Sequence, residues 1–290
     1  MGLFRKKIGP VFMKESSDAE LFIEKMEDLK FNSSGSLKDD IDKQIRLAKY
    51  GLIGERNVAY ELKNSDLDMY IIHDLYLEYG DMNAQIDYLV VTRKHIYVIE
   101  CKNLFGNIEI DNSGNFIRSY ELLGKYVKEG IYSPITQNQR HMRILKEIRK
   151  ASKQNIFSKF LFERNFDNNY KSIIVLANPK TYLNSKYAKK EVKEQVIRAD
   201  QLISYIKKTD NADTSIEMDE NTMYDLAQFY LNSNQPTKSN YVQKYDVVLT
   251  EATQEKTNCS LSAPASEEIN SSTTSICCDT STSNEALIKE

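Results

Sequence analysis

The chain has 290 residues, of which 41% are hydrophobic and 28% are charged, and its formal net charge is -3. This composition is typical of a globular protein, and the length suffices for one substantial domain with appendages or for two small domains. The small net charge by itself neither favours nor excludes a polyanionic partner.

The charges are distributed unevenly along the chain. Residues 139–198 contain fifteen Lys and Arg against five Asp and Glu, whereas residues 251–290 contain two Lys against seven acids. A basic segment can neutralise the phosphates of a nucleic acid, although a run of charge is commonly just a solvated surface. Both interpretations stay open for residues 139–198.

Cysteine usage and hydropathy favour a cytoplasmic, reducing location. The four cysteines, at positions 101, 259, 277 and 278, form no C-x-x-C pair and no pattern typical of a disulfide framework. The first residues lack the apolar stretch of a signal peptide. The longest apolar runs are far shorter than the roughly 18 residues of a membrane helix. We therefore expect no membrane association, and the oligomeric state stays open.

The first half of the chain alternates between helical and strand-like patterns. Residues 1–50 are predicted to form a helical arm of two charged helices, the second ending near Gly51. A helix is predicted over residues 53–62, with Glu55 in its first turn. Three strands rich in Ile, Val, Tyr and Leu are predicted next, over residues 70–78, 85–92 and 95–101.

The remaining predicted elements complete an α/β pattern. We expect a hairpin over residues 103–120, a helix over 134–150, strands over 172–177 and 195–199, and a helix over 201–208. The order of helix, three-stranded antiparallel meander, helix and strand predicts a crossover through the second helix. Residues 209–252 are predicted to be a poorly defined helical extension, with a helix near 223–231. Residues 253–290 have almost no large apolar side chains and are predicted to be a disordered tail.

Two acidic residues interrupt apolar strands. Asp87 lies within Ile-Asp-Tyr-Leu-Val-Val and Glu100 ends Ile-Tyr-Val-Ile. Such charges are costly unless they are paired or bound to a cation. If the two strands form a hairpin centred on residues 93 and 94, paired positions sum to 187, so that Asp87 lies opposite Glu100 and Gln85 opposite Lys102. Alternation then places all four side chains on one face of the sheet.

This register predicts a metal site beside a lysine. Cβ atoms of directly opposed residues lie about 5 Å apart, so that the carboxylates of Asp87 and Glu100 repel each other unless a cation neutralises them. A hard divalent cation such as Mg²⁺ fits that need, and Lys102 adds a positive charge suited to an anionic transition state. The alternative is a solvent-facing hairpin in which Lys102 only forms a salt bridge, because antiparallel sheets commonly expose one polar face.

The same residues carry a resemblance to a known family. Gly54-Glu55, Gln85-Ile86-Asp87, Ile99-Glu100-Cys101-Lys102-Asn103 and Gly106-Asn107-Ile108 resemble the nuclease-related domain, a branch of the PD-(D/E)xK phosphodiesterase superfamily. Pro134, Gln137, Arg140 and His141 extend the likeness onto the following helix. The resemblance covers residues 50–150 well and 170–208 loosely.

The resemblance implies a restriction-endonuclease-like core and cleavage of phosphodiesters with Mg²⁺ or Mn²⁺. Asp87 and Glu100 would be the metal ligands, Glu55 would orient the attacking water and Lys102 would orient or activate it. Gln137 would be a supporting polar residue from the helix, and Gln85 another beside the strand. Many members carry a zinc ribbon near the C-terminus, but Cys259, Cys277 and Cys278 form no C-x-x-C pair and so do not supply such a finger.

The sequence therefore predicts a nuclease domain over residues 51–208 that acts on nucleic acid, with DNA as the first choice. Two alternatives stay open. One is a non-catalytic module that binds nucleic acid, and the other is an interaction scaffold that retains the fold. The presence of Asp87, Glu100 and Lys102 together disfavours the first, because a decayed site is expected to have lost at least one of them.

Overall fold

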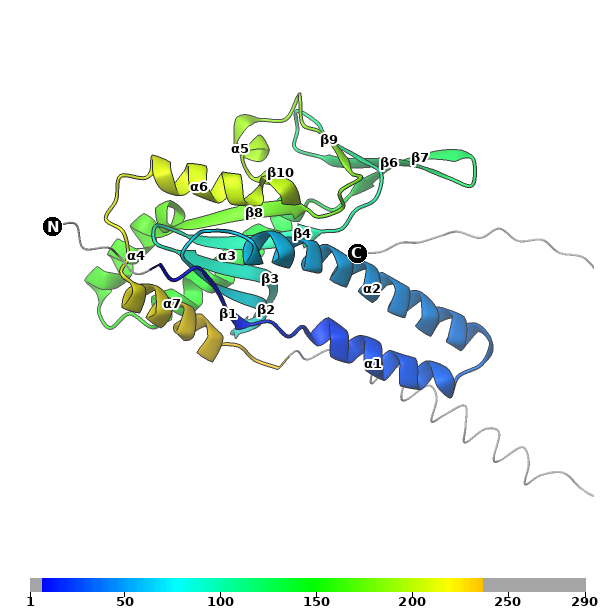
Figure 1. Cartoon of the computed structure of the whole chain (residues 1–290), viewed down its shortest axis with the longest axis horizontal. Coiled ribbons are helices and arrows are strands. Elements are labelled where there is room, and N and C mark those ends of the chain that lie inside the picture. Colours follow the sequence, from blue (N-terminus) through cyan, green and yellow to red (C-terminus); the bar gives the residue numbers. More distant parts are fainter. Residues whose placement is uncertain (1–6, 237–290) are drawn as a thin grey trace, which may run out of the picture. The chain divides into compact units, whose positions relative to one another are not determined.

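The computed structural model describes residues 7–236, which fold as a mixed α/β structure with two sheets (Figure 1). The helices are α1 (Asp18–Phe31), α2 (Gly35–Lys63), α3 (Pro134–Ala151), α4 (Ile156–Asn169), α5 (Lys190–Lys193), α6 (Leu202–Ala212) and α7 (Glu220–Asn232). The strands are β1 (Pro10–Lys14), β2 (Met69–Tyr79), β3 (Met82–Thr92), β4 (Ile96–Lys102), β5 (Asn107–Ile110), β6 (Phe116–Leu122), β7 (Lys125–Ile131), β8 (Tyr170–Leu176), β9 (Tyr182–Asn184) and β10 (Val196–Arg198).

The larger sheet has the strand order β1-β2-β3-β4-β8-β10. Strands β2, β3 and β4 form the predicted antiparallel meander. Strand β8 pairs with β4 in parallel, so the chain returns between them through α3 and α4, which confirms the predicted crossover. Parallel strands β1 and β10 form the two edges. The meander and the crossover together bring the C-terminal end of β4 into the middle of the sheet.

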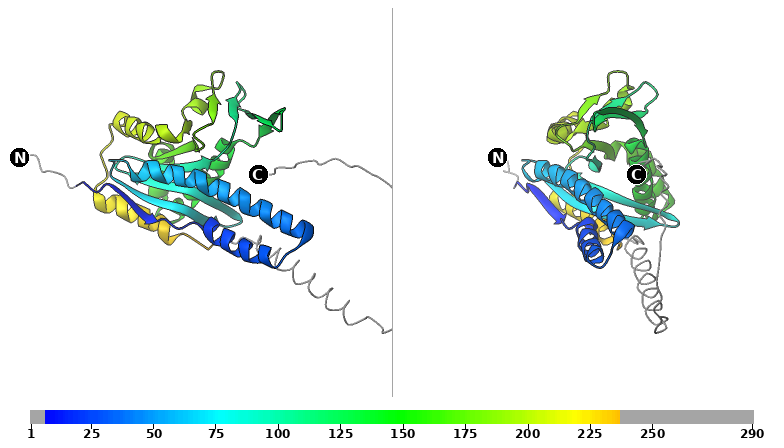
Figure 2. Two further views of the ribbon diagram at one scale, coloured as in Figure 1. Left: turned by 45° about the vertical axis from the view of Figure 1, so that its right-hand side comes forward. Right: turned by 90° about the vertical axis from the view of Figure 1, so that its right-hand side faces the viewer.

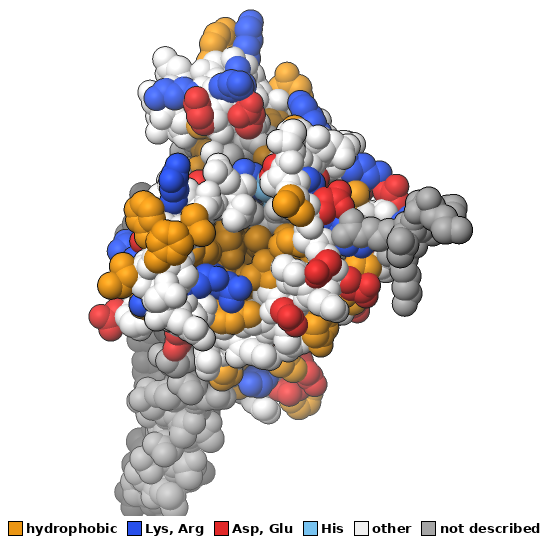
Figure 3. Space-filling view, turned by 90° about the vertical axis from the view of Figure 1, so that its left-hand side faces the viewer, with side chains coloured by type: hydrophobic (Ala, Val, Ile, Leu, Met, Phe, Trp, Pro, Cys, Tyr) orange, Lys and Arg blue, Asp and Glu red, His pale blue; other side chains and the backbone are white. Residues whose placement is uncertain are grey.

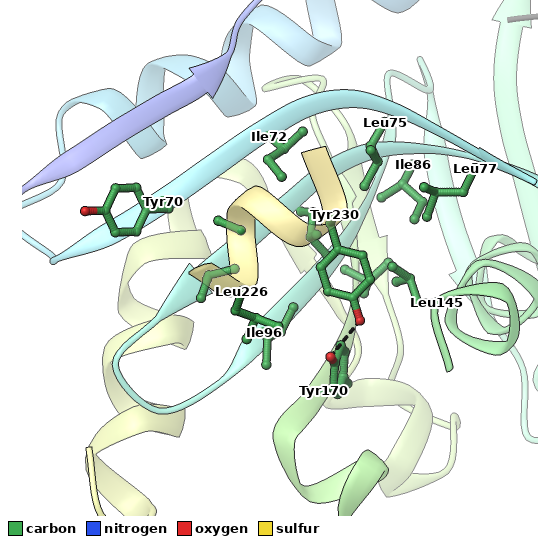
Figure 4. Close-up of a cluster of buried hydrophobic side chains, with 14 of the residues drawn as sticks. Tyr70, Ile72, Leu75, Leu77, Ile86, Ile96, Leu145, Tyr170, Leu226 and Tyr230 are labelled. Atoms are coloured by element: carbon green, nitrogen blue, oxygen red, sulfur yellow. Dashed lines mark hydrogen bonds between the residues drawn. The ribbon is translucent and has the colours of Figure 1, made fainter. Parts of the chain in front are cut away.

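Helices cover both faces of this sheet. On one face, α2 and α6 pack against Ile71, Tyr88, Val90, Tyr97 and Ile99. On the other face, α3, α4 and α7 pack against alternate residues of the same strands, and Figure 4 shows this second cluster. Figure 4 also shows the hydroxyl groups of two buried tyrosines from β8 and α7, which hydrogen-bond at 2.7 Å. The meander strands are therefore apolar on both sides, and a carboxylate within them needs a special reason to be there.

The smaller sheet has the order β7-β6-β5-β9; β5, β6 and β7 are inserted between β4 and α3, whereas β9 follows β8. The hairpin predicted over residues 103–120 is confirmed as β5 and β6, which are joined by a turn at residues 112–114. Asp111 stabilises this turn, because its Oδ1 accepts hydrogen bonds from the amides of Ser113 and Asn115. Strands β7 and β9 were not predicted. The hairpin of β6 and β7 projects beyond the larger sheet (Figure 1).

The predicted end of a helix at Gly51 is wrong. Helix α2 runs without interruption for 29 residues, from the arm into the helix that carries Glu55, and α1 packs alongside its first half (Figure 2). A glycine terminates a helix by adopting a positive φ, and Gly51 does not have one. Buried Ile41, Ile45, Leu52 and Val58 continue one apolar side through the glycine. The boundary predicted at residues 50 and 51 is therefore no break in the structure.

Strand β1 and helix α4 were also not predicted from the sequence. Helix α6 continues four residues beyond the predicted end of the domain at residue 208. The helix expected near 223–231 is confirmed as α7. The tail at 253–290, together with residues 237–252 of the extension, lies outside the described residues. Within residues 7–236, no helix combines the length and apolarity that crossing a membrane requires.

Candidate functional site

The candidate residues gather at the C-terminal end of β4, between α2 on one face of the sheet and the first turns of α3 on the other. Glycine 54 allows α2 to approach, because a Cβ atom there would lie 2.5 Å from the Cβ of Asn103, which follows β4. On the opposite side, Asn138 of α3 donates hydrogen bonds to the carbonyl of Val98 and to the hydroxyl of Ser172. These contacts fix both helices against the end of the strand.

The predicted register between β3 and β4 is confirmed. Tyr88 pairs with Ile99 and Val91 pairs with Ile96, and both pairs sum to 187. The ladder ends one position before Asp87 and Glu100. Instead of a further ladder bond, the Asp87 carboxylate accepts a hydrogen bond of 2.6 Å from the amide of Cys101. Asp87 thus takes the place of a backbone carbonyl at the end of the ladder.

A kink in β2 and β3 explains this arrangement. Asp74 of β2 lies opposite Asp87 in the register, between the pairs His73–Tyr88 and Leu75–Ile86, and has a φ of 53°. Few residues other than glycine adopt this left-handed conformation within a strand. The alternation of faces slips here, since Ile86 packs in the same apolar cluster as residues 89 and 91. Asp87 therefore lies at the kink in the sheet. Its carboxylate interacts there electrostatically with Glu100 and with Glu55.

The slip overturns the predicted position of Gln85. Alternation without a kink would place Gln85 opposite Lys102 on the same face. Residues 84 and 86 instead pack on the side of α3, which turns Gln85 to the other side of the sheet. There its side-chain amide donates a hydrogen bond of 2.7 Å to Asp74. Asp74 also accepts from the amide of Asp18, so Gln85 supports the kink and does not contact Lys102.

Glu100 is the most deeply placed acid of the site. Only 2% of the residue is exposed, and its Oε1 lies 2.9 Å from the Nζ of Lys102. Its Oε2 has no hydrogen-bond partner among the described residues and lies 3.4 Å from the Nδ1 of His141, which also has none. Burial raises the pKa of Glu100, and the ammonium group of Lys102 opposes that rise.

Asp87 and Glu100 affect each other's charge. Burial of its carboxyl group raises the pKa of Asp87 well above the usual value, and the negative charges of Glu100 and Glu55 add to the rise. The Cys101 amide works in the opposite direction. Three carboxylates therefore share one region in which their negative charge is incompletely compensated, and a cation placed there would lower the free energy of the ionised forms.

Lys102 lies between Glu100 and the first turns of α3. Its Nζ donates a hydrogen bond of 2.9 Å to the Oε1 of Gln137. Burial disfavours the charged ammonium, but the Glu100 carboxylate outweighs this effect and the pKa of Lys102 is raised. Lys102 is therefore a fixed positive charge at neutral pH. The helix begins at Pro134, with Ser133 as its cap, so Gln137 projects from the first turns towards β4.

Glu55 reaches the site from α2 and is held by two aromatic residues. The hydroxyl of Tyr88 donates to the backbone carbonyl of Glu55 at 2.8 Å. The Nε2 of His73 lies 2.9 Å from Oε2 of Glu55, and the His73 ring stacks on Tyr88 with centroids 4.6 Å apart. The Nδ1 of His73 lies 2.8 Å from the carbonyl of Glu15 and donates to it. Burial lowers the pKa of His73, but the bonds to Glu55 and Glu15 outweigh it and the pKa is raised.

The donor set suits a hard cation held partly by water or substrate. No three His, Cys, Asp or Glu side chains in the described part of the chain are placed to hold a metal ion by themselves. Carboxylate oxygens from Asp87 and Glu100 remain, and the second oxygen of Glu100 is buried without a partner. Mg²⁺ is commonly bound by one or two carboxylates and otherwise by water and substrate phosphates. The residues present therefore fit such an ion.

Two histidines are also part of this region: His73, which was not predicted from the sequence, and His141, which was named only in the family resemblance. His73 interrupts the apolar run Tyr-Ile-Ile-His-Asp-Leu, which is the same signal that identified Asp87. His141 follows Gln137 by four residues, so both lie on one side of α3. Burial and the charge of Lys102 lower the pKa of His141 to about 4, so it is neutral at neutral pH.

Comparison with known proteins gives one family match. Residues 50–177 match the model of the nuclease-related domain, and this range spans Glu55, the meander, strands β5 to β7 of the smaller sheet, α3 and β8. No curated protein and no solved structure matches the chain significantly. The match is consistent with the PD-(D/E)xK phosphodiesterase superfamily. The chain thus contains a nuclease-related domain over residues 50–177.

Proposed function

We propose that the chain is a metal-dependent nuclease that hydrolyses phosphodiester bonds, with DNA as substrate and Mg²⁺ or Mn²⁺ as cofactor. The single observation that supports this most strongly is the buried Glu100, which has one oxygen on Lys102 and the other without a partner. A structural salt bridge would not need the second oxygen to be left unsatisfied, because an unpaired buried polar group costs about 1–3 kcal/mol. A cation at this oxygen removes that cost.

In this proposal each residue has a separate role. Asp87 and Glu100 would hold the cation, which when bound supplies positive charge to a phosphate group. Lys102, held by Glu100 and Gln137, keeps an ammonium group beside the carboxylates, where the transition state becomes more anionic. Glu55, held by His73, accepts a hydrogen bond from the attacking water and orients it. The proposal includes a restriction-endonuclease-like arrangement of the core and a cytoplasmic location.

The experiment is cleavage of a substrate panel under single-turnover conditions. Linear, nicked, branched and single-stranded DNA and the corresponding RNA are incubated with Mg²⁺ or Mn²⁺ and wild-type protein, Glu100→Ala or Lys102→Ala. Loss of one preorganised electrostatic group typically lowers turnover by about 10²–10³-fold, or roughly 3–4 kcal/mol. We therefore expect Lys102→Ala to cleave at least 100-fold more slowly, and Glu100→Ala to lose metal binding as well.

A matched control separates chemistry from charge and stability. Lys150 forms an ion pair of 2.6 Å with Glu163 near the end of α3, thirteen residues from Gln137 and so about 20 Å along the helix. Lys150→Ala is expected to cleave at the wild-type rate. If Lys102→Ala cleaves at the wild-type rate, Lys102 acts only as a salt-bridge partner of Glu100. A wild-type protein that binds nucleic acid but cleaves nothing with either metal would favour the non-catalytic module.

A further inference from the structure

A second feature suited to nucleic acid lies outside the acidic site. A hollow of about 1000 Å³ is enclosed by α3, the end of α4 with the start of β8, the segment around α5, and the C-terminal half of α6. In Figure 3 the face of the molecule is hollowed at its centre, with hydrophobic side chains as the floor and Lys or Arg side chains beside it. The hollow lies at the edge of the larger sheet, where β10 is the last strand.

The charges around the hollow are predominantly positive. Five Lys and Arg and three Asp and Glu line it. The five cations are Arg143, Lys146, Lys171, Lys193 and Lys208, and within residues 7–236 none of them forms an ion pair with a carboxylate. Lysine and arginine side chains on opposite walls, such as Arg143 on α3 and Lys208 on α6, are both exposed. Uncompensated positive charge in a groove attracts a polyanion.

The floor of the hollow adds apolar and aromatic surface. Tyr205 of α6 is half-buried and lines the hollow beside Met142 and Ile197. Phe166 and Tyr170 stack at 4.3 Å beneath them. A positive groove with an aromatic platform is the combination that holds a single strand, because the backbone meets the cations and a base stacks on the ring. A duplex keeps its bases stacked inside and gains nothing from such a ring.

Helix α3 connects the hollow to the acidic site. Gln137 and His141 face the site from one side of the helix. Gln139, Arg143 and Lys146, at helical spacings of four and three residues, line the hollow from the other side of the helix. Arg143 lies six residues beyond Gln137, which is about 9 Å along the helix axis. A strand in the hollow would therefore need to pass around α3 to reach the carboxylates.

We infer that the hollow binds a single strand of nucleic acid through its phosphodiester backbone, with a base stacked on Tyr205. The identity of the ligand rests on the proposed nuclease function, whereas the location rests on the hollow itself. The hollow thereby favours substrates that have single-stranded ends or gaps.

The test measures binding without cleavage. A fluorescein-labelled single-stranded oligonucleotide of twelve residues, as DNA or as RNA, is titrated with protein in EDTA while anisotropy is recorded at several salt concentrations. The variant Arg143→Glu/Lys208→Glu is compared with Lys38→Glu/Lys43→Glu, which makes the same change of charge at exposed positions of α2. Tyr205→Leu is measured as well, because it retains apolar volume and loses the ring. Thermal unfolding of each variant checks its fold.

We expect the Arg143/Lys208 variant to bind at least tenfold more weakly than the wild type. The slope of log K against log salt should fall by about 1.4, which is about 0.7 for each lost phosphate contact. Tyr205→Leu should bind about tenfold more weakly with the slope unchanged, since stacking carries little salt dependence. The Lys38/Lys43 variant should match the wild type.

Three outcomes would overturn the inference: equal binding by the Arg143/Lys208 variant and the wild type, equal losses in both charge-reversed variants, or no binding by the wild type. An unchanged affinity of Tyr205→Leu would show that no base stacks on Tyr205, and the inferred preference for a single strand would then be wrong. The nuclease proposal is judged separately. A protein that binds through the hollow but does not cleave with Mg²⁺ or Mn²⁺ would keep this inference and refute the catalytic function.

Discussion

The neutral state of His141 leads to a prediction about stability and pH. Burial and the charge of Lys102 lower its pKa to about 4 in the folded protein, against the ordinary value of 6.5. Between pH 6.5 and pH 4, the unfolded chain therefore binds a proton that the folded protein does not. The free energy of unfolding must fall as the pH falls through this window. A His141→Gln variant has no such proton, so its stability should not show this contribution.

The size of the effect follows from the shift. A difference of about 2.5 pKa units at about 1.4 kcal/mol per unit corresponds to about 3 kcal/mol over the whole window. Only 8% of the His141 side chain is exposed, so solvent screening reduces this value little. At pH 7 the free energies of unfolding of the wild type and His141→Gln should differ less than this. One reason is that the side-chain amide introduced at position 141 can donate a hydrogen bond to the unpaired oxygen of Glu100. The prediction concerns the change with pH and not the difference at one pH.

The assay is urea unfolding in EDTA at intervals between pH 4.5 and pH 9, followed by far-ultraviolet circular dichroism because the chain has no Trp. His73→Gln is a control of opposite sign. The pKa of His73 is raised, so its contribution to stability is fully present below pH 6.5 and is lost as the pH rises through the folded value. Parallel pH profiles for wild type and His141→Gln would refute the reasoning, because they would mean that His141 titrates alike in both states.

Further predictions concern the metal ligands and the packing of α2. Asp87→Asn should raise the melting temperature of the metal-free protein by removing a buried charge whose pKa is raised by burial, Glu100 and Glu55. Calorimetry should also show that it loses the stabilisation by Mn²⁺, which for a bound ion is about 2.7 kcal/mol at 100 times the dissociation constant; equal metal shifts in both proteins would exclude Asp87 as a ligand. Gly54→Ala should cost about 1–3 kcal/mol in urea unfolding and slow cleavage, because its Cβ would lie 2.5 Å from that of Asn103. Gly51→Ala on the same helix has open space and should stabilise the protein by about 0.5–1 kcal/mol, so a similar loss in both variants would contradict the packing argument.

The sequence by itself determined the local pairing of the strands that carry Asp87 and Glu100. The apolar runs around Asp87 and Glu100 predicted the meander and its register, and the register is confirmed. This was possible because a hairpin with a short turn leaves few alternative pairings. The helix that carries Gln137 and the crossover to β8 were also predictable, because the apolar periodicity of these segments is strong. Lys102 followed from its place directly after a buried strand.

Only the tertiary structure decided how these residues meet. The positive φ of Asp74 depends on contacts from Asp18 and Gln85, which are distant in sequence, and it turns Gln85 away from the face where alternation placed it. The same holds for Gly54, because its close approach to Asn103 exists only in the folded chain. Periodicity reports which side of a strand or helix is apolar, but a kink, a close approach or an unpaired oxygen on Glu100 arises from groups that meet only when the chain has folded.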